Sequence, residues 1–232
     1  MDFADLPDNL KLVLEEIDRV QCREGVSGAV RIVAVTKGHP SAAVVAAHSA
    51  GVADIGENRV QEALGKQDAT RDLRVRWHLV GHLQTNKAKY LPGRFSVVHS
   101  VDSVRVADAL AAAVERSDRS EARIDAMVQV NVAGETQKSG CQPAETLEIA
   151  ARIAERPALQ LVGLMTMAPF TDDEKIQRDV FAGLRKLRED LQHHGLAAPE
   201  LSMGMSADYR AAVAEGATIL RLGTALFGER PT

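Results

Sequence analysis

The stretch Arg31-Ile-Val-Ala-Val-Thr-Lys37 is a run of aliphatic and β-branched residues that ends in a lysine, and the turn signal Gly38-His39-Pro40 follows at once. Such a run predicts a buried β-strand. Because α/β proteins bind ligands at the carboxyl ends of their strands, Lys37 is expected at the mouth of a sheet or barrel. A partly desolvated lysine has a lowered pKa and attacks aldehydes. On this run alone, a solvated lysine at a strand end is the commoner interpretation.

Seven further apolar runs follow along the chain of 232 residues. They lie at residues 52–57, 75–81, 96–101, 124–132, 159–167, 201–205 and 217–223. Helical patterns separate most of them, at residues 41–50, 103–117, 142–156, 172–193 and 207–215, with a shorter one over 83–90. This alternation predicts an α/β fold with a parallel sheet, and eight units fit a single TIM-like (β/α)8 barrel. The alternative is a doubly wound open sheet, which would more often have fewer strands and a Gly-rich first turn.

The N-terminal segment predicts one helix in addition to the barrel. Residues 9–24 have an amphipathic pattern whose apolar face holds Leu10, Leu14, Ile17 and Val20. Gly and Pro fall singly at element ends, and no low-complexity linker divides the chain. We therefore expect a single domain over residues 1–232, in which residues 1–27 form a helix that packs on the barrel.

Composition limits the class of protein. Hydrophobic residues make up 45% and aromatic residues only 3%, so the core must be aliphatic, as suits strands buried on both faces. The net charge of -4 offers no basic excess for nucleic acid. Cys22 and Cys141 form no framework, the N-terminus is not a secretory signal, and no apolar stretch reaches the ~18 residues of a membrane span. We expect a soluble cytoplasmic protein that binds neither nucleic acid nor membrane.

Unusual polar residues and methionines collect where the predicted strands end. They are Lys37, Glu57, Asn58, His78, Gly81, Ser100, Asp102, Asn131, Met165, Thr166, Met167, Met203, Ser206, Arg221 and Thr224. In a barrel, all of these would converge on the face where barrel enzymes have their active sites. No spacing of His and Cys typical of a metal site appears, and no GxSxG elbow is present.

The last two predicted strands suggest a phosphate site, because barrels often bind phosphate there. Ser206 offers a hydroxyl, and Gly223-Thr224 offers backbone N–H groups and a second hydroxyl. Ser206 is alternatively the N-cap of a helix that begins at Ala207, a role compatible with binding phosphate. Arg221 needs a partner if it is buried, either a neighbouring carboxylate such as Glu57 or a ligand acceptor. His78 on an apolar strand is more often a core histidine than a ligand.

Motifs in order along nearly the whole chain resemble the YggS/PROSC family of pyridoxal-phosphate homeostasis proteins. They are Ala34-Val-Thr-Lys37, Ile55-Gly-Glu-Asn-Arg-Val-Gln-Glu62, Trp77-His-Leu-Val-Gly81, Leu83-Gln-Thr-Asn-Lys87, Val98-His-Ser-Val-Asp102, Val130-Asn131, Gly163-Leu-Met-Thr-Met167, Leu201-Ser-Met-Gly-Met-Ser-Ala-Asp208 and Arg221-Leu-Gly-Thr-Ala-Leu-Phe-Gly228. The departures are mild: Thr36 stands where many relatives have serine, Arg59 where they have tyrosine, and His82 is unusual.

The resemblance implies a fold like the N-terminal barrel of alanine racemase, and pyridoxal 5′-phosphate (PLP) as cofactor. It implies that Lys37 forms the Schiff base and that Arg221 lies at the pyridine nitrogen. It places Ser206, Gly223 and Thr224 at the phosphate. Asn58 and Met165 are implied near the ring, and His78 is included among the cofactor-binding residues. No catalytic residue and no metal ligand are assigned.

The implied site favours a carrier of PLP over an enzyme. An arginine can only donate, so the pyridine nitrogen stays unprotonated and the ring is a poorer electron sink. The chain ends at Thr232, and we expect no second domain to supply a second catalytic base. The expected protein is a monomer that holds PLP and passes it to apo-enzymes. Two alternatives stay open: a weak amino-acid racemase with His78 or water as second base, and a phosphate-binding barrel isomerase without cofactor.

Overall fold

Eight parallel strands close into a barrel in the computed structural model, which describes residues 3–117, 123–135 and 137–229. Each strand pairs with the next in sequence, and β8 pairs with β1. The strands are β1 (Arg31–Val35), β2 (Asp54–Glu57), β3 (Arg76–Leu79), β4 (Val97–Val101), β5 (Ile124–Gln129), β6 (Leu159–Met165), β7 (Glu200–Ser202) and β8 (Ile219–Leu222). The expected (β/α)8 barrel is confirmed, and the open sheet is excluded.

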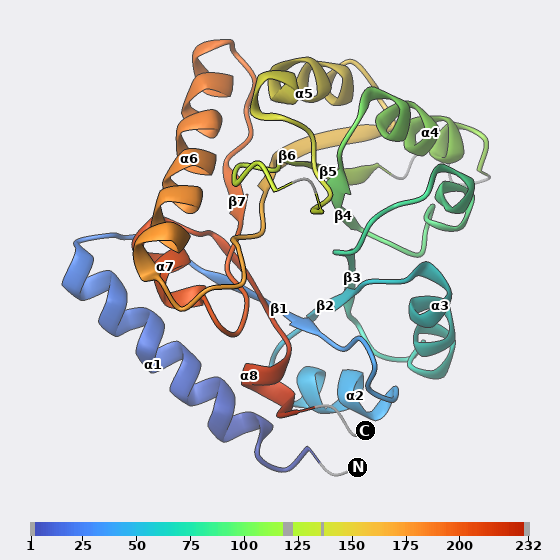
Figure 1. Ribbon diagram of the computed structural model, residues 1–232. Helices are drawn as coiled ribbons and strands as arrows, with labels where there is room; N and C mark the ends of the chain where they lie inside the picture. The colour runs from blue at the N-terminus through green and yellow to red at the C-terminus, as the bar shows by residue number, and fades with distance from the viewer. Residues whose placement is uncertain (1–2, 118–122, 136, 230–232) are drawn as a thin grey trace.

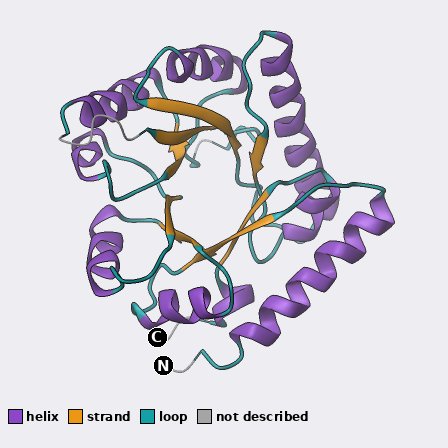
Figure 2. Ribbon diagram, turned by 180° about the vertical axis from the view of Figure 1, so that it is seen from behind, coloured by secondary structure: helices purple, strands orange, loops and turns teal. Residues whose placement is uncertain are grey.

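Helices surround the barrel on its outside (Figure 1). They are α1 (Leu6–Glu24), α2 (Ala42–Ser49), α3 (Val60–Ala69), η1 (Thr85–Tyr90), α4 (Val104–Glu115), η2 (Pro143–Glu145), α5 (Thr146–Ala154), α6 (Glu174–His193), α7 (Tyr209–Ala214) and α8 (Thr224–Phe227). The view from behind shows the same ring of strands inside the ring of helices (Figure 2). None of the helices within the described ranges is long and apolar enough to cross a membrane.

The additional N-terminal helix packs against α7 and α8 (Figure 1). Its buried face consists of Leu6, Leu10, Val13, Ile17 and Val20. Leu14, which we expected on this face, is 44% exposed. Steps of three and four residues keep a helical stripe on one side, and Val13 continues that stripe from Leu10, whereas Leu14 lies about 100° further round. Residues 1–2 and 230–232 of the expected single domain lie outside the described residues.

The core is aliphatic, as the composition predicts, and has two parts. The larger part lies between the strands and the outer helices. The smaller part fills the barrel interior with Val33, Val97, Met127, Met165 and Ile219. The barrel interior also contains polar side chains from β2, β3, β4, β7 and β8, which are described below with the site.

The end of the barrel where the strands begin is closed by charged residues. Arg31 pairs with Glu200 at 3.3 Å, and Arg76 pairs with Asp54 at 3.9 Å and with Asp125. Because these side chains are all partly exposed, each pair contributes little to stability by itself. Because each of these arginines is paired with a carboxylate, this end of the barrel does not favour the binding of a charged ligand.

Candidate functional site

Lys37 lies at the carboxyl end of the barrel, in the turn that follows β1. The strand ends at Val35, two residues before the lysine, so Lys37 is in the turn and not at the strand tip. Gly38 has φ 76°, a conformation that favours glycine, and the chain then enters α2. The Lys37 side chain is half-buried. It therefore has the position at the barrel mouth that the sequence predicted.

The residues on both sides of Lys37 are tied to helix α3 by a group of side chains that we call the outer network: Thr36, Glu57, Glu62 and Lys66. Lys66 Nζ donates to the Thr36 carbonyl oxygen at 2.6 Å, to Glu57 Oε1 at 2.6 Å and to Glu62 Oε1 at 2.9 Å. Thr36 Oγ1 donates to Glu57 Oε1 at 2.5 Å, and the Gly38 amide donates to Glu62 Oε1 at 2.7 Å. These bonds fix the turn that carries Lys37.

Glu57 is the most deeply buried carboxylate of the outer network. Its side chain is 0% exposed, and burial raises the pKa of the Glu57 carboxyl although Lys66 and Thr36 both donate to it. The ion pair with Arg221, weighed from the sequence, does not form, because Glu57 faces out of the barrel toward α3. Lys66 was not among the predicted site residues. Its place four residues after Glu62 was the only available signal.

Arg221 lies inside the barrel on β8 and is 5% exposed. Its Nη1 donates to Ser202 Oγ at 2.8 Å, and its Nη2 donates to the Thr166 carbonyl oxygen at 2.9 Å. Burial lowers the pKa of Arg221 to about 10, against the field of Asp208, so the group stays charged at neutral pH. Among the described residues, no carboxylate forms an ion pair with it. A buried cation whose protein partners are neutral favours a ligand acceptor beside it.

Ser206 and the start of α8 lie together at the same end of the barrel. Ser206 Oγ accepts a hydrogen bond from the Ala225 amide at 3.0 Å. This contact joins the β7–α7 loop to Gly223 and Thr224, which precede Ala225. The N-cap alternative for Ser206 is wrong: α7 begins at Tyr209, and its N-cap is Asp208. The structure thus brings together hydroxyl and backbone groups that suit a phosphate.

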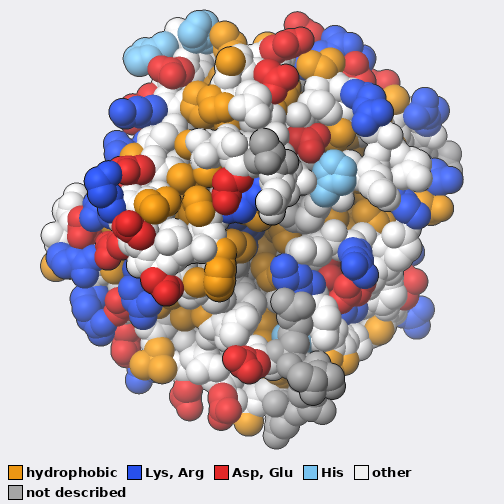
Figure 3. Space-filling model, in the orientation of Figure 1, with side chains coloured by type: hydrophobic (Ala, Val, Ile, Leu, Met, Phe, Trp, Pro, Cys, Tyr) orange, Lys and Arg blue, Asp and Glu red, His pale blue; other side chains and the backbone are white. Residues whose placement is uncertain are grey.

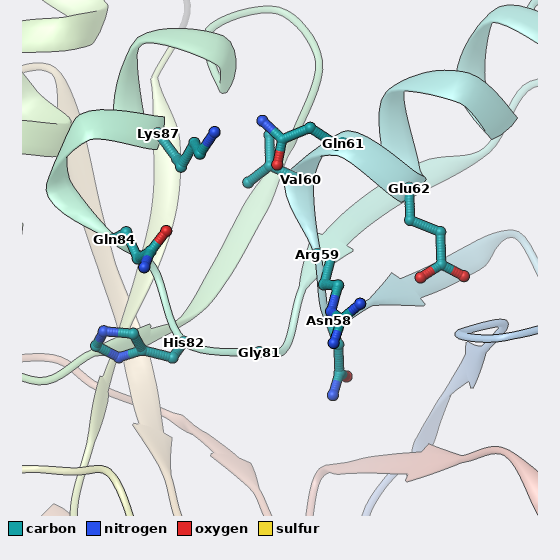
Figure 4. A pocket seen from close by; sticks show the side chains of 9 residues that line it. All are labelled: Asn58, Arg59, Val60, Gln61, Glu62, Gly81, His82, Gln84 and Lys87. Atoms are coloured by element: carbon teal, nitrogen blue, oxygen red, sulfur yellow. The ribbon is translucent and has the colours of Figure 1, made fainter.

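Asn58 follows β2 and lines a cavity of about 580 Å³ between the start of α3 and the β3–η1 connection (Figure 4). Gln61 and Lys87 point toward each other across the cavity in this view. Gly81 allows the two connections to meet, since a Cβ there would overlap the Asn58 backbone.

Met165 is 0% exposed in the barrel interior. The molecular face in this orientation is hollowed near its centre, with hydrophobic side chains and a basic group inside the hollow (Figure 3).

His78 belongs to a series of side chains inside the barrel that we call the inner chain: Asp54, His78, His99, Ser202 and Arg221. His78 Nε2 lies 2.7 Å from Asp54 Oδ1, and His78 Nδ1 lies 2.8 Å from His99 Nε2. His99 Nδ1 lies 2.8 Å from Ser202 Oγ, which accepts from Arg221. Both ring nitrogens of His78 are therefore engaged within the protein, and His78 reaches the site only through the other members.

Burial favours the neutral form of both imidazoles in the inner chain. Burial lowers the pKa of His78 against the hydrogen bond to Asp54, and burial places the pKa of His99 well below its usual range. Burial alone would raise the pKa of Asp54, but the interaction with His78 and the charges of Arg31 and Arg76 together outweigh it, and the pKa is lowered. His99 and Ser202 were not singled out from the sequence. The signal was a polar residue inside an apolar strand, as for His78.

A family model described as the N-terminal domain of alanine racemase matches residues 16–231. The fold and the matched length define the chain as a barrel protein of the alanine racemase N-terminal domain class. An alanine racemase of Clostridium difficile superposes with a TM-score of 0.76 at 15% identity, and the match covers 97% of this chain and 60% of that one. At this identity, the similarity shows the fold alone.

Closer relatives narrow the class. The pyridoxal phosphate homeostasis protein of Aquifex aeolicus is 39% identical over 225 residues, which are 96% of this chain and 97% of that protein. The Homo sapiens protein of the same name is 41% identical over 212 residues, covering 86% and 76%. Within the barrel class, the chain belongs to the family of pyridoxal phosphate homeostasis proteins.

Solved structures of PipY from Synechococcus elongatus share the fold at higher identity. The structure without PLP is 35% identical and superposes with a TM-score of 0.85, and the match covers 96% of this chain and 100% of that one. The structure described as having PLP bound is 37% identical with a TM-score of 0.79, over 92% and 100%.

Proposed function

We propose that this protein binds PLP at the carboxyl end of its barrel and acts in PLP homeostasis. When bound, PLP supplies an aldehyde, and the Lys37 amine condenses with it to form a C=N bond with release of water. Arg221 donates to the ring nitrogen. Ser206, Gly223 and Thr224 hold the phosphate, and Asn58 and Met165 lie near the ring. His78 acts on the site indirectly, through Arg221.

The observation that carries this proposal is the buried Arg221 guanidinium, whose two hydrogen bonds go to neutral acceptors. The same strand leads to Gly223 and Thr224, and Ser206 lies against the next amide. A ligand with a ring acceptor and a phosphate would use both groups. The names of the relatives and the PLP described in one PipY structure support this donor set as a PLP site.

A carrier role is supported better than catalysis. Arg221 only donates, so a ring nitrogen beside it stays unprotonated, and a neutral ring is a poor sink for a carbanion. The racemase alternative needs a second base, and His78 does not suit that role because both its nitrogens are engaged. We expect a monomer that passes PLP to apo-enzymes. Free Cys22 and Cys141 agree with a reducing cytoplasm.

The experiment is an absorption titration of the purified protein with PLP, followed by borohydride reduction and peptide mapping. Wild type should give a reducible chromophore whose adduct maps to Lys37. Lys37→Ala should lose the chromophore and keep its thermal unfolding transition. An adduct trapped elsewhere in Lys37→Ala would overturn the role of Lys37, and a colourless wild type would favour the cofactor-free isomerase.

The phosphate groups are tested in the same titration. The double variant Ser206→Ala with Thr224→Ala should weaken the binding of PLP far more than the binding of pyridoxal, which lacks the phosphate. Each removed hydroxyl takes away a hydrogen bond to a charged group, which is worth about 1.5–3 kcal/mol. Equal loss for both ligands would remove the pair from the phosphate site. Amino-acid turnover of ~1 per second or more, abolished in Lys37→Ala, would favour the enzyme.

A further inference from the structure

The inner chain crosses the whole barrel, from the end where strands begin to the end with the proposed site. Asp54 lies at the first end with 19% of its side chain exposed, and His78, its partner, is 0% exposed. His99 and Ser202 are also 0% exposed, and Arg221 is buried at the far end. Four consecutive contacts of 2.7–2.8 Å connect the five side chains. Because the interior of such a barrel is usually filled with aliphatic residues, a continuous series of polar side chains across it indicates a specific role.

The two ends of the inner chain dictate the direction of every hydrogen bond in it. Arginine can only donate, and an ionised aspartate can only accept. Ser202 therefore accepts from Arg221 and uses its own proton to donate to His99 Nδ1. A neutral His99 then carries its proton on Nε2 and donates to His78 Nδ1. His78 in turn carries its proton on Nε2 and donates to Asp54.

We propose that His78, His99 and Ser202 are positioning residues that hold Arg221 as a hydrogen-bond donor toward the ring nitrogen of the ligand, with both imidazoles in the single Nε2–H tautomer. This inference rests on the proposed function for its ligand, an aromatic heterocycle with an unprotonated ring nitrogen. The serine is the last link: its oxygen accepts a hydrogen bond from Arg221, and its own proton is donated to His99. Thr166 supplies the second anchor of the guanidinium.

The electrostatic surroundings favour this neutral arrangement. Arg31, Arg76 and Arg221 all act on the imidazoles and disfavour a second positive charge beside them. Asp54 is the carboxylate that faces His78, and its charge is balanced by Arg31 and Arg76. A protonated His99 would donate from Nδ1 to Ser202, so the serine oxygen would accept from both His99 and Arg221, and its own proton would lose His99 as an acceptor. The neutral imidazoles are therefore the state in which every contact of the inner chain pairs one donor with one acceptor.

A matched pair of serines separates positioning from ordinary packing. Ser202 and Ser100 both lie on barrel strands at 0% exposure, but the Ser100 hydroxyl has no hydrogen-bond partner among the described residues. Ser202→Ala breaks the inner chain, whereas Ser100→Ala removes a hydroxyl that holds nothing. The probes are PLP and 1-deaza-PLP, a carbocyclic analogue in which a C–H replaces the ring nitrogen.

Wild type and Ser100→Ala should bind PLP about tenfold or more tighter than the deaza analogue, the worth of a charge-assisted hydrogen bond. Ser202→Ala should reduce this ratio severalfold and should shift the absorption of bound PLP. An unchanged ratio in Ser202→Ala, with PLP still bound, overturns the positioning role and leaves the proposed function intact. Failure of wild type to bind PLP overturns the proposed function instead.

A second measurement needs no ligand. Nitrogen-15 NMR of the ligand-free full-length protein reports which imidazole nitrogen carries the proton, and His99→Gln assigns the His99 signals. We expect His78 and His99 to be neutral Nε2–H tautomers at pH 7–8. A Nδ1–H tautomer or a protonated ring at either position would contradict the direction of the inner chain.

Discussion

The outer network and the inner chain lie on opposite sides of the barrel wall and serve the same end of the barrel by different means. The outer network buries Lys66 and Glu57 at 2.6 Å from each other, between the strands and α3. The inner chain separates its charged ends, Asp54 and Arg221, by two imidazoles and a serine. The first holds the backbone around Lys37, and the second holds one side chain, Arg221.

The difference shows what each network risks when a member is lost. Buried opposite charges in direct contact leave a bare charge if one is removed, and the whole fold is penalised. Loss of a neutral link removes hydrogen bonds but leaves no bare charge, so the penalty is smaller and chiefly changes the orientation of the next group. Stability measurements should therefore respond chiefly to the outer network, and ligand selectivity to the inner chain.

The largest expected effect comes from Lys66→Met. Methionine has a similar length but no charge, so it leaves the Glu57 carboxylate, which is 0% exposed, without a cation. Removal of one partner of a buried ion pair costs about 3–5 kcal/mol. Urea unfolding at pH 7 should show a loss of that order.

The control is the double variant Lys66→Met with Glu57→Gln, which removes both charges. It should recover much of the lost stability, since an uncharged amide is far less costly to bury than a lone carboxylate. A single variant that loses less than about 1 kcal/mol would mean that water reaches Glu57 and that the outer network behaves as a surface pair.

A smaller effect is expected from Thr36→Val, which keeps the shape of the side chain but removes the hydroxyl that donates to Glu57 at 2.5 Å. A bond to a charged group contributes about 1.5–3 kcal/mol, so urea unfolding should show a loss in that range. Thr36→Ser keeps the hydroxyl and should lose less. If the valine and serine variants are equally stable, the hydroxyl does not support Glu57.

The barrel was predictable from the sequence because buried parallel strands have continuous aliphatic runs that need no tertiary information. The exact ends were not. The apolar run through residues 217–223 contains β8, and the apolar residues that follow it, Thr224–Phe227, form the short helix α8. The sequence did not show this boundary, because periodicity alone does not separate a short buried strand from a short buried helix. Helix α3 had no pattern assigned, and Gly65 in its middle weakens the signal.

The site was predictable to the extent that one end of a barrel collects the ends of its strands. Lys37, Ser206 and Arg221 could be grouped on this basis and by family resemblance, although their roles in binding PLP remain predictions. The partners of Arg221 could not be foreseen. Which face of a strand points inward depends on register, and only the register shows that Glu57 faces α3 while Ser202 faces Arg221.

The pH dependence of stability is the smallest of the expected effects. It distinguishes the two networks, because acidification changes their contributions to the free energy of unfolding in opposite directions. The folded-state pKa of His78 and of His99 is lowered. Below the unfolded-state pKa of about 6.5, the unfolded chain therefore binds more protons at these residues than the folded protein does. Their contribution to stability is therefore present above this pH and is lost as pH falls. Glu57 acts oppositely, because its raised pKa favours the folded state as pH falls toward the unfolded value.

The buried His99 imidazole should lower the free energy of unfolding as pH falls below 6.5, with a slope that approaches about 1.4 kcal/mol per pH unit. Urea unfolding of wild type and His99→Gln at pH 6.5 and 5.5 isolates this contribution, since Glu57 and the other titrating groups are common to both proteins. The glutamine variant should start less stable, because it disturbs two buried bonds, and should lose about 1 kcal/mol less between pH 6.5 and 5.5, since the unfolded imidazole is already half protonated at pH 6.5. Equal losses in the two proteins would mean that His99 takes up a proton in the folded state, which would also undo the single direction of hydrogen bonds on which the position of Arg221 depends.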